Sequence, residues 1–158
     1  MDPIVIHITG HPVPQGRPRA AVISGHAVLY KPKQSRQWEN DARQVARQKM
    51  GSRTPLTGCL SLEMGVSLTP PQSWPSWKYE AAIEGKIRPT GRPDVSNYLK
   101  AAEDALNGVV WIDDSQVVSI TVHKVYGQTP GVRLTVREIE DAHPAQITKR
   151  ADLKMGTK

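Results

Sequence analysis

The chain has 158 residues and a net charge of +6, with 21 Lys and Arg against 15 Asp and Glu, and it contains no Phe. This length predicts one domain with a modest, aliphatic core. The charge favours an acidic polymer as partner, although a merely basic protein has the same balance, and the single cysteine, Cys59, excludes an intrachain disulfide framework.

Apolar periodicity predicts the elements of the first half of the chain. We expect a strand at residues 4–9, a hairpin at 20–30 that turns at Ser24-Gly25, a helix from about residue 35 to residue 50, and a strand at 58–68. The prolines of segment 69–77 exclude regular structure there. In this segment Trp74 and Trp77 either stack on splayed bases or fix the loop to the body.

The second half of the chain predicts two helices and two further strands. A short helix is expected at 78–85 and a longer one at 96–107, which Asn107-Gly108 ends because glycine suits a helix C-terminal cap. Strands follow at 116–125 and 132–139. We expect residues 1–140 to form one domain and the polar residues 141–158 to form a flexible tail. No apolar run reaches the ~18–20 residues of a membrane span and no secretory signal is present, which predicts a cytoplasmic protein.

Basic residues gather in the first third of the chain. The loop VPQGRPRA projects two arginines, which suit a phosphate clamp as well as a solvated turn. In the helix at 35–50, three arginines line up roughly 160° from the packed side that includes Trp38. Such a stripe is either solvated surface or a track for the nucleic-acid backbone. The predicted DNA contacts are Arg17, Arg19, Lys31, Lys33, Arg36, Arg43, Arg47 and Arg92.

The densest chemistry lies between residues 88 and 120. Asn97, Lys100 and Asp104 fall at i, i+3 and i+7, so they share one helix face. Asp94 precedes this helix, and Asp113-Asp114 follow it after one turn. Carboxylates that converge beside a lysine suit a hard cation and a phosphate ester. Two plainer interpretations stay open, namely that Asp94 caps the helix and that the Asp113-Asp114 pair forms a turn.

Other kinds of site have little support in the sequence. The five histidines show no metal-ligand spacing, and no nucleophile elbow, Walker loop or dinucleotide fingerprint is present. The acids therefore indicate an oxygen-rich Mg²⁺ site rather than zinc or covalent catalysis. Glu63 alternates with the apolar residues of its strand, so it is either a further ligand or a solvated strand residue.

The central motif, RPDVSNYLKAAEDALNG followed by VVWIDDSQV, resembles the signature of the RusA family of Holliday junction resolvases. That signature is written P-D-x-D-N-x-x-K, D-A-L-N/T and D-D-x-Q-V. The segments VPQGRPRA, YKPKQSRQWE and SWPSW resemble the phage and prophage branch of the family, and the resemblance spans roughly residues 4 to 139.

The resemblance implies an α+β protein with a single small domain, in which helices flank a mixed or antiparallel sheet. It implies a homodimer that nicks four-way DNA junctions symmetrically in recombination and repair, with Mg²⁺, or alternatively Mn²⁺, bound by aspartates. The motif assigns catalysis to Asp94, Lys100 and Asp114, metal binding to Asp94, Asp113, Asp114 and Ser96, and supporting roles to Asn97 and Asp104.

One position departs from the signature, because Ser96 stands where the family has its second aspartate. Fewer carboxylates should weaken Mg²⁺ binding, although a serine hydroxyl can still ligate the ion and Asp104, Asp113 or Glu63 could compensate. The sequence therefore leaves a second function open, a junction-binding protein that cuts poorly or not at all. A third, a small-molecule phosphohydrolase, leaves the many arginines unexplained.

Overall fold

The structure, a computed structural model, describes residues 1–141. These residues form a four-stranded sheet in the order β1 (Ile4–Thr9), β6 (Gly131–Ile139), β4 (Cys59–Leu68) and β5 (Val117–Tyr126). Neighbouring strands are antiparallel except β4 and β5, which are parallel. The predicted α+β class with a mixed sheet and flanking helices is confirmed.

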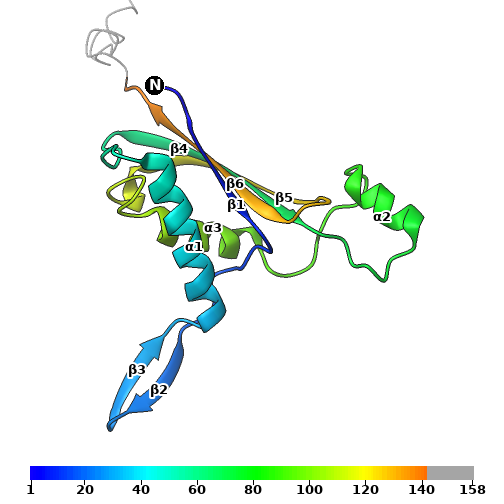
Figure 1. The fold of residues 1–158 in the computed structure, drawn as a ribbon, viewed down its shortest axis with the longest axis horizontal. Coiled ribbons are helices and arrows are strands. Elements are labelled where there is room, and N and C mark those ends of the chain that lie inside the picture. The colour runs from blue at the N-terminus through cyan, green and yellow to red at the C-terminus, as the bar shows by residue number, and fades with distance from the viewer. Residues whose placement is uncertain (142–158) are drawn as a thin grey trace, which may run out of the picture.

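Two helices cover one face of this sheet, namely α1 (Lys33–Met50) and α3 (Val95–Leu106) (Figure 1). Alternate residues of β4 point toward them, so Leu62 and Met64 are buried between sheet and helices. α1 contributes Trp38 to this core, whereas α3 contributes mainly alanines. Small side chains let α3 lie close to the sheet, which places its first turn near the sheet edge formed by β5.

The parallel pairing of β4 with β5 requires a long crossover, and the chain uses it to build the predicted site. The crossover contains α2 (Ser76–Ile83), which lies away from the sheet, and then α3 (Figure 1). After α3 the chain passes the fully buried Trp111 and a short 3₁₀ turn, η1 (Asp114–Gln116), before it enters β5. Both predicted acidic clusters therefore lie in one connection.

The hairpin of β2 (Arg19–Ile23) and β3 (His26–Tyr30) is a separate two-stranded sheet. It projects from the N-terminal end of α1, clear of the four-stranded sheet (Figure 1). Ser24 and Gly25 both have positive φ, 51° and 81°, as a two-residue turn with the twist of a hairpin requires. The predicted hairpin and its turn are confirmed.

Some predicted boundaries are wrong by a few residues. The helix expected at 78–85 begins at Ser76, because Pro75 occupies the N-cap, where its missing N–H costs nothing. The strand expected from residue 116 begins at Val117, because Gln116 belongs to η1. The predicted tail lies outside the described residues apart from residue 141. Within residues 1–141, no helix combines the length and the hydropathy that a membrane span needs.

Candidate active site

Asp94 is the N-cap residue of α3, yet its side chain makes no capping hydrogen bond. The carboxylate is exposed, and so are the neighbouring side chains of Ser96 and Asn97 in the first turn. Asp94 therefore occupies the N-cap position that the plainer interpretation expected, but without the side-chain hydrogen bond of a capping residue. Its carboxylate is available to a ligand, and the positive end of the helix dipole lies beside it.

The loop that leads into Asp94 is held by a residue that the sequence motif did not indicate. Nζ of Lys124, on β5, donates to the carbonyl oxygens of Gly91 and Pro93 at 2.7 and 2.9 Å. These two residues flank Arg92, and Pro93 directly precedes Asp94. Lys124 thus fixes the backbone of this loop against the sheet.

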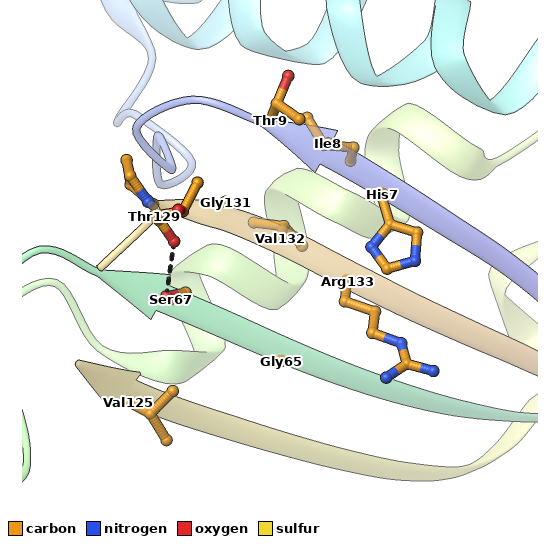
Figure 2. Close-up of a pocket in the computed structure, with 11 residues that line it drawn as sticks. His7, Ile8, Thr9, Gly65, Ser67, Val125, Thr129, Gly131, Val132 and Arg133 are labelled. Carbon is orange, nitrogen blue, oxygen red and sulfur yellow. Dashed lines mark hydrogen bonds between the residues drawn. The ribbon is translucent and has the colours of Figure 1, made fainter. Parts of the chain in front are cut away.

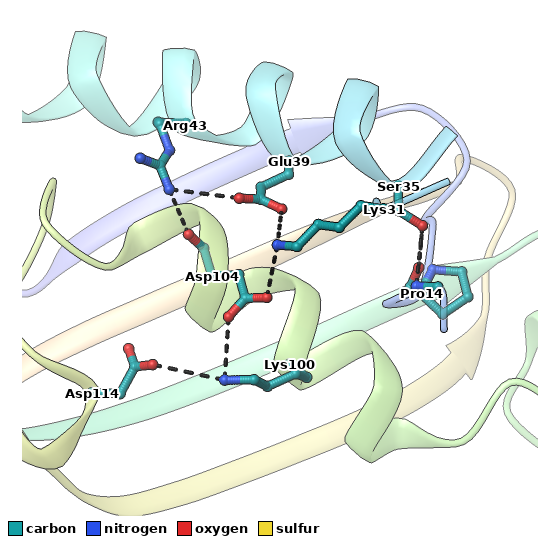
Figure 3. A network of polar contacts seen from close by, with 9 residues as sticks. Pro14, Lys31, Ser35, Glu39, Arg43, Lys100, Asp104 and Asp114 are labelled. Carbon is teal, nitrogen blue, oxygen red and sulfur yellow. Dashed lines mark hydrogen bonds and ion pairs between the residues drawn. The ribbon is translucent and has the colours of Figure 1, made fainter. Parts of the chain in front are cut away.

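Lys100 lies between two carboxylates (Figure 3). Its Nζ is 3.2 Å from Oδ1 of Asp104 and 3.9 Å from Oδ2 of Asp114. The hydrogen bond with Asp104 raises the pKa of Lys100, burial opposes this effect, and the charge of Asp114 adds to it. The ammonium therefore stays charged at neutral pH, while about half of the side chain, 53%, is exposed to a ligand.

Asp114 is fixed from the core. The indole Nε1 of Trp111 donates to Oδ1 of Asp114 at 2.8 Å, which leaves Oδ2 facing Lys100. Glu103 lies in the same electrostatic environment: burial raises the pKa of its carboxyl, and the charge of Asp114 raises it further. The site thus concentrates negative charge around one lysine, as a cation site does.

Asp113 has a different role from its neighbour. Its Oδ1 accepts a hydrogen bond from Ser115 N at 2.8 Å, while Oε1 of Gln116 accepts from Asp113 N at 2.9 Å, which is a capping box. The hydrogen bond from Ser115 lowers the pKa of Asp113. Gln116 also donates to the carbonyls of Leu56 and Gly58 and so ties this turn to the start of β4. The turn interpretation is therefore correct for Asp113, and its predicted part in metal binding gains no support.

A network of ion pairs links α1 with α3 beside Lys100 (Figure 3). Nζ of Lys31 is 2.7 Å from Glu39 Oε2 and 3.2 Å from Asp104 Oδ2. Arg43 donates to the backbone carbonyl of Asp104 at 2.6 Å and lies 3.6 Å from Glu39. Burial acts to lower the pKa of Lys31, but hydrogen bonds with Glu39 and Asp104 outweigh it and raise that pKa.

Two predicted DNA contacts are therefore engaged inside the protein. Arg43 is half-buried rather than part of an exposed stripe, because its long side chain reaches the C-terminal part of α3, and Lys31 bridges carboxylates of both helices. The other predicted contacts are exposed: Arg17, Arg19, Lys33, Arg36, Arg47 and Arg92.

The residues present fit Mg²⁺ only if the substrate completes its coordination. Within residues 1–141 no three side chains of His, Cys, Asp or Glu are grouped closely enough to hold a metal ion. Mg²⁺ commonly uses one or two carboxylates together with substrate phosphates and water, so the carboxylates of Asp94 and Asp114 suffice in kind and number. Glu63 cannot compensate for Ser96, because it is exposed on the sheet face opposite α3.

That opposite face carries a shallow hollow of about 320 Å³ (Figure 2). His7, Arg133 and Gly65 lie along one row of paired residues there, and Ser67 donates to the carbonyl of Thr129 at its end. None of the predicted site residues lines it. The predicted site residues Asp94, Ser96, Asn97 and Lys100 are instead exposed to solvent, where a long polymer can reach them.

The two tryptophans of segment 69–77 differ in their surroundings, because Trp74 lies in the loop whereas Trp77 belongs to α2. Trp74 packs edge-on against Tyr126, with ring centroids 5.5 Å apart, and Nζ of Lys78 lies 4.0 Å from the centre of its ring. Trp74 therefore fixes the loop to the end of β5. Trp77 is 69% exposed, so stacking on a base stays a prediction for this residue alone.

Fold and site together define a small α+β protein that exposes Asp94 and Lys100 to solvent and carries further exposed arginines elsewhere on its surface. The family model described as Endodeoxyribonuclease RusA matches residues 9–137, and the chain belongs to this family. A relative, named Uncharacterized protein YqaN, from Bacillus subtilis (strain 168), is 38% identical over 141 residues, which cover 88% of this chain and 99% of the relative. The predicted family is confirmed, and DNA is the substrate class that it implies.

Proposed function

We propose that this protein is a Mg²⁺-dependent, structure-selective endonuclease that resolves four-way DNA junctions by paired nicks, in recombination and repair. The observation that supports this most is the position of Lys100 on α3. Its Nζ lies 3.9 Å from Oδ2 of Asp114, and the N-cap of the same helix is Asp94, whose side chain makes no capping hydrogen bond. The site therefore offers two carboxylates for a cation and one ammonium for a phosphate.

Each residue has a distinct task in this proposal. Asp94 and Asp114 would hold Mg²⁺, or Mn²⁺ in its place, and the exposed hydroxyl of Ser96 is a further oxygen within the first turn of α3. When bound there, the ion would supply activation of a water molecule and would offset charge on the phosphoryl group. Lys100 would stabilise the charge that develops on the phosphate oxygens, since its raised pKa keeps it protonated. Trp111 would keep the Asp114 carboxylate oriented.

The exposed arginines and Lys33 would hold phosphates without reading sequence. A junction has two-fold symmetry, so we propose that the active form is a homodimer that presents two sites to two strands. Binding would then weaken steeply with salt, because each phosphate contact releases counterions. A phosphohydrolase for small molecules would show no comparable salt dependence.

The test is the nicking of a synthetic four-way junction with Mg²⁺ and with EDTA. Symmetric paired nicks should require Mg²⁺, and each of Asp94→Asn, Asp114→Asn and Lys100→Met should reduce the rate at least about 100-fold. The matched control is Lys49→Met, which removes an exposed lysine of the last turn of α1 and should leave the rate unchanged. Wild-type protein that cuts the junction equally well in EDTA would overturn the proposal.

Ser96 supports a second candidate, a protein that binds junctions without cutting them. The site has one carboxylate fewer than the family signature, and within residues 1–141 no third acid replaces it. Tight binding without nicking, together with nicking restored by Ser96→Asp, would establish this second function. Ser76→Asp introduces the same change in the first turn of α2 and is the matched control.

A further inference from the structure

The β2–β3 hairpin, here called the arm, exposes large apolar side chains on both of its faces. Val22 is 76% exposed, Leu29 74% and Ile23 59%. Opposed residues of an antiparallel pair share a face, so the register places Val22 and Leu29 on one face, and Ile23, Val28 and Tyr30 on the other. Such concentrated apolar exposure usually marks an interaction site.

The arm has little stabilisation of its own. A two-stranded hairpin alone is marginally stable in water, and the four-stranded sheet does not pair with this one. Apart from Arg19 at its base, which lies opposite Tyr30, the arm contains no Asp, Glu, Lys or Arg, so no charge keeps the outer part of either face in solvent. An occupant that covers both faces would therefore stabilise the arm.

The chemistry of the two faces indicates what this occupant is. An antiparallel pair that docks on one protein surface commonly buries one face and keeps polar residues on the other. This arm exposes large apolar side chains on both faces, so it requires an apolar surface on each side. The end faces of base pairs at a DNA branch point provide two such surfaces. With side chains on both faces the arm is about 10 Å thick, far more than one base-pair step of about 3.4 Å, so it fits an opened branch point and not an intact duplex.

The base of the arm carries basic residues, whereas its outer part is apolar. Arg17 lies just before the arm and Arg19 is the first residue of β2. Lys33 and Arg36 lie in the first turn of α1, and all four side chains are exposed. They would contact the phosphates that surround a branch point while the tip contacts bases. The charge of this region is thus complementary to DNA.

Both ends of the arm are fixed to the helix that carries the active site. Gln15 N donates to the carbonyl of Asn97 at 3.0 Å, and at the other end Lys31 binds Asp104 at 3.2 Å. Ser35 joins the two ends, since its Oγ accepts from Gly16 N and donates to the carbonyl of Pro14. The arm therefore cannot shift relative to α3 without breaking these contacts.

We propose that the arm inserts into the centre of branched DNA, selects a branch point over a duplex, and sets the distance between that point and the scissile phosphate. This rests on the proposed function in its choice of substrate, while binding and base unstacking can be measured without cleavage. The reach of the arm follows from its five-residue strands, at about 3.3 Å per residue roughly 17 Å.

The experiment compares wild type with Val22→Thr/Leu29→Thr, which keeps strand propensity and removes apolar surface from one face. Val118→Thr is the matched control, because Val118 is 61% exposed on β5. Affinities for a junction and for a duplex are measured in EDTA, and 2-aminopurine at the branch point reports unstacking. The double variant should lose the junction preference at least about tenfold and lose the fluorescence rise, while its duplex affinity stays unchanged.

Each remaining outcome decides the question. An unchanged preference and fluorescence rise in the double variant would overturn the role of the arm. A change from dimer to monomer by light scattering, with the fluorescence rise retained, would assign the arm to a second copy of the chain instead. If wild type binds and unstacks the junction but does not nick it with Mg²⁺, the nuclease proposal fails and the inference about the arm stands.

Discussion

The buried indole of Trp111 and the carboxylate of Asp114 are joined by a hydrogen bond of 2.8 Å, between Nε1 and Oδ1. Trp111 is fully buried in the hydrophobic core, so this bond restrains the partly exposed carboxylate of Asp114. Only Oδ2 of Asp114 then faces Lys100. A carboxylate that is fixed in this way loses little entropy when it binds a cation, which is how a supporting residue improves a site.

We predict that Trp111→Phe lowers the nicking rate about tenfold, because it frees Asp114 while it keeps an aromatic ring in the core. Loss of the hydrogen bond should also reduce the free energy of unfolding by about 1 kcal/mol. Trp38→Phe is the control, since the buried Nε1 of Trp38 has no hydrogen-bond partner within the described residues. A similar loss of rate in Trp38→Phe, measured alongside thermal unfolding, would show that packing alone explains the effect.

Substitution by serine should affect the nicking rate at Asp114 but not at the adjacent Asp113. Asp113→Ser preserves a side-chain oxygen that can cap η1, since serine is a favourable N-cap residue, so nicking should remain within about twofold of wild type. Asp114→Ser removes a carboxylate that faces Lys100 and should reduce the rate at least about 100-fold. The measurement is single-turnover nicking at saturating Mg²⁺. Equal losses in the two variants would return Asp113 to the metal site.

The local geometry of the candidate site could be predicted from the sequence, because it depends on nearby residues, whereas the roles of its residues stay a prediction from the family motif. The i, i+4 relation of Lys100 and Asp104 follows from helical periodicity, and the structure confirms it as an ion pair of 3.2 Å. The hydrophobic alternation of β4 likewise predicted a strand with one buried face. These features need no knowledge of how the elements pack.

Contacts between distant elements could not be predicted in the same way. Lys31 and Asp104 are 73 residues apart, and periodicity carries no information about which helices become neighbours. Helical periodicity places Arg43 in a basic stripe on the side of α1 away from Trp38, but its long side chain binds the carbonyl of Asp104 on α3. The hairpin pattern likewise predicted β2 and β3 without indicating that nothing in the described sheet covers them.

Lys124 should act on the metal requirement through the loop that it holds. Lys124→Met removes both hydrogen bonds to the carbonyls before Asp94, so the half-saturating Mg²⁺ concentration should rise about tenfold. Lys124→Arg can still donate to both carbonyls and should restore most of the wild-type response. Nicking is measured across a Mg²⁺ titration for each variant. A lower rate at every Mg²⁺ concentration with an unchanged midpoint would contradict a positioning role.

The ion pair of Lys31 and Asp104 should contribute stability within a defined pH range. Burial raises the pKa of Asp104, but hydrogen bonds with Lys31 and Lys100 outweigh it and lower the pKa below its ordinary 3.8. This contribution is therefore present above pH 3.8 and is lost as the pH falls through the lower folded-state value. The pKa of Lys31 is raised above 10.5, so the contribution from the lysine is present below pH 10.5 and is lost as the pH rises through the folded-state value.

We expect Lys31→Met to reduce the free energy of unfolding by about 0.5–1 kcal/mol between pH 5 and 9, since the pair is partly exposed and screened. This difference from wild type should shrink as the pH falls below 3.8, when Asp104 becomes protonated in both proteins. Urea unfolding at each pH provides the measurement. Lys86→Met removes a comparable but exposed pair with Glu84 and should change nothing measurable. A difference that persists undiminished at pH 2 would show that Lys31 stabilises the protein through the packing of its aliphatic chain and not through its charge.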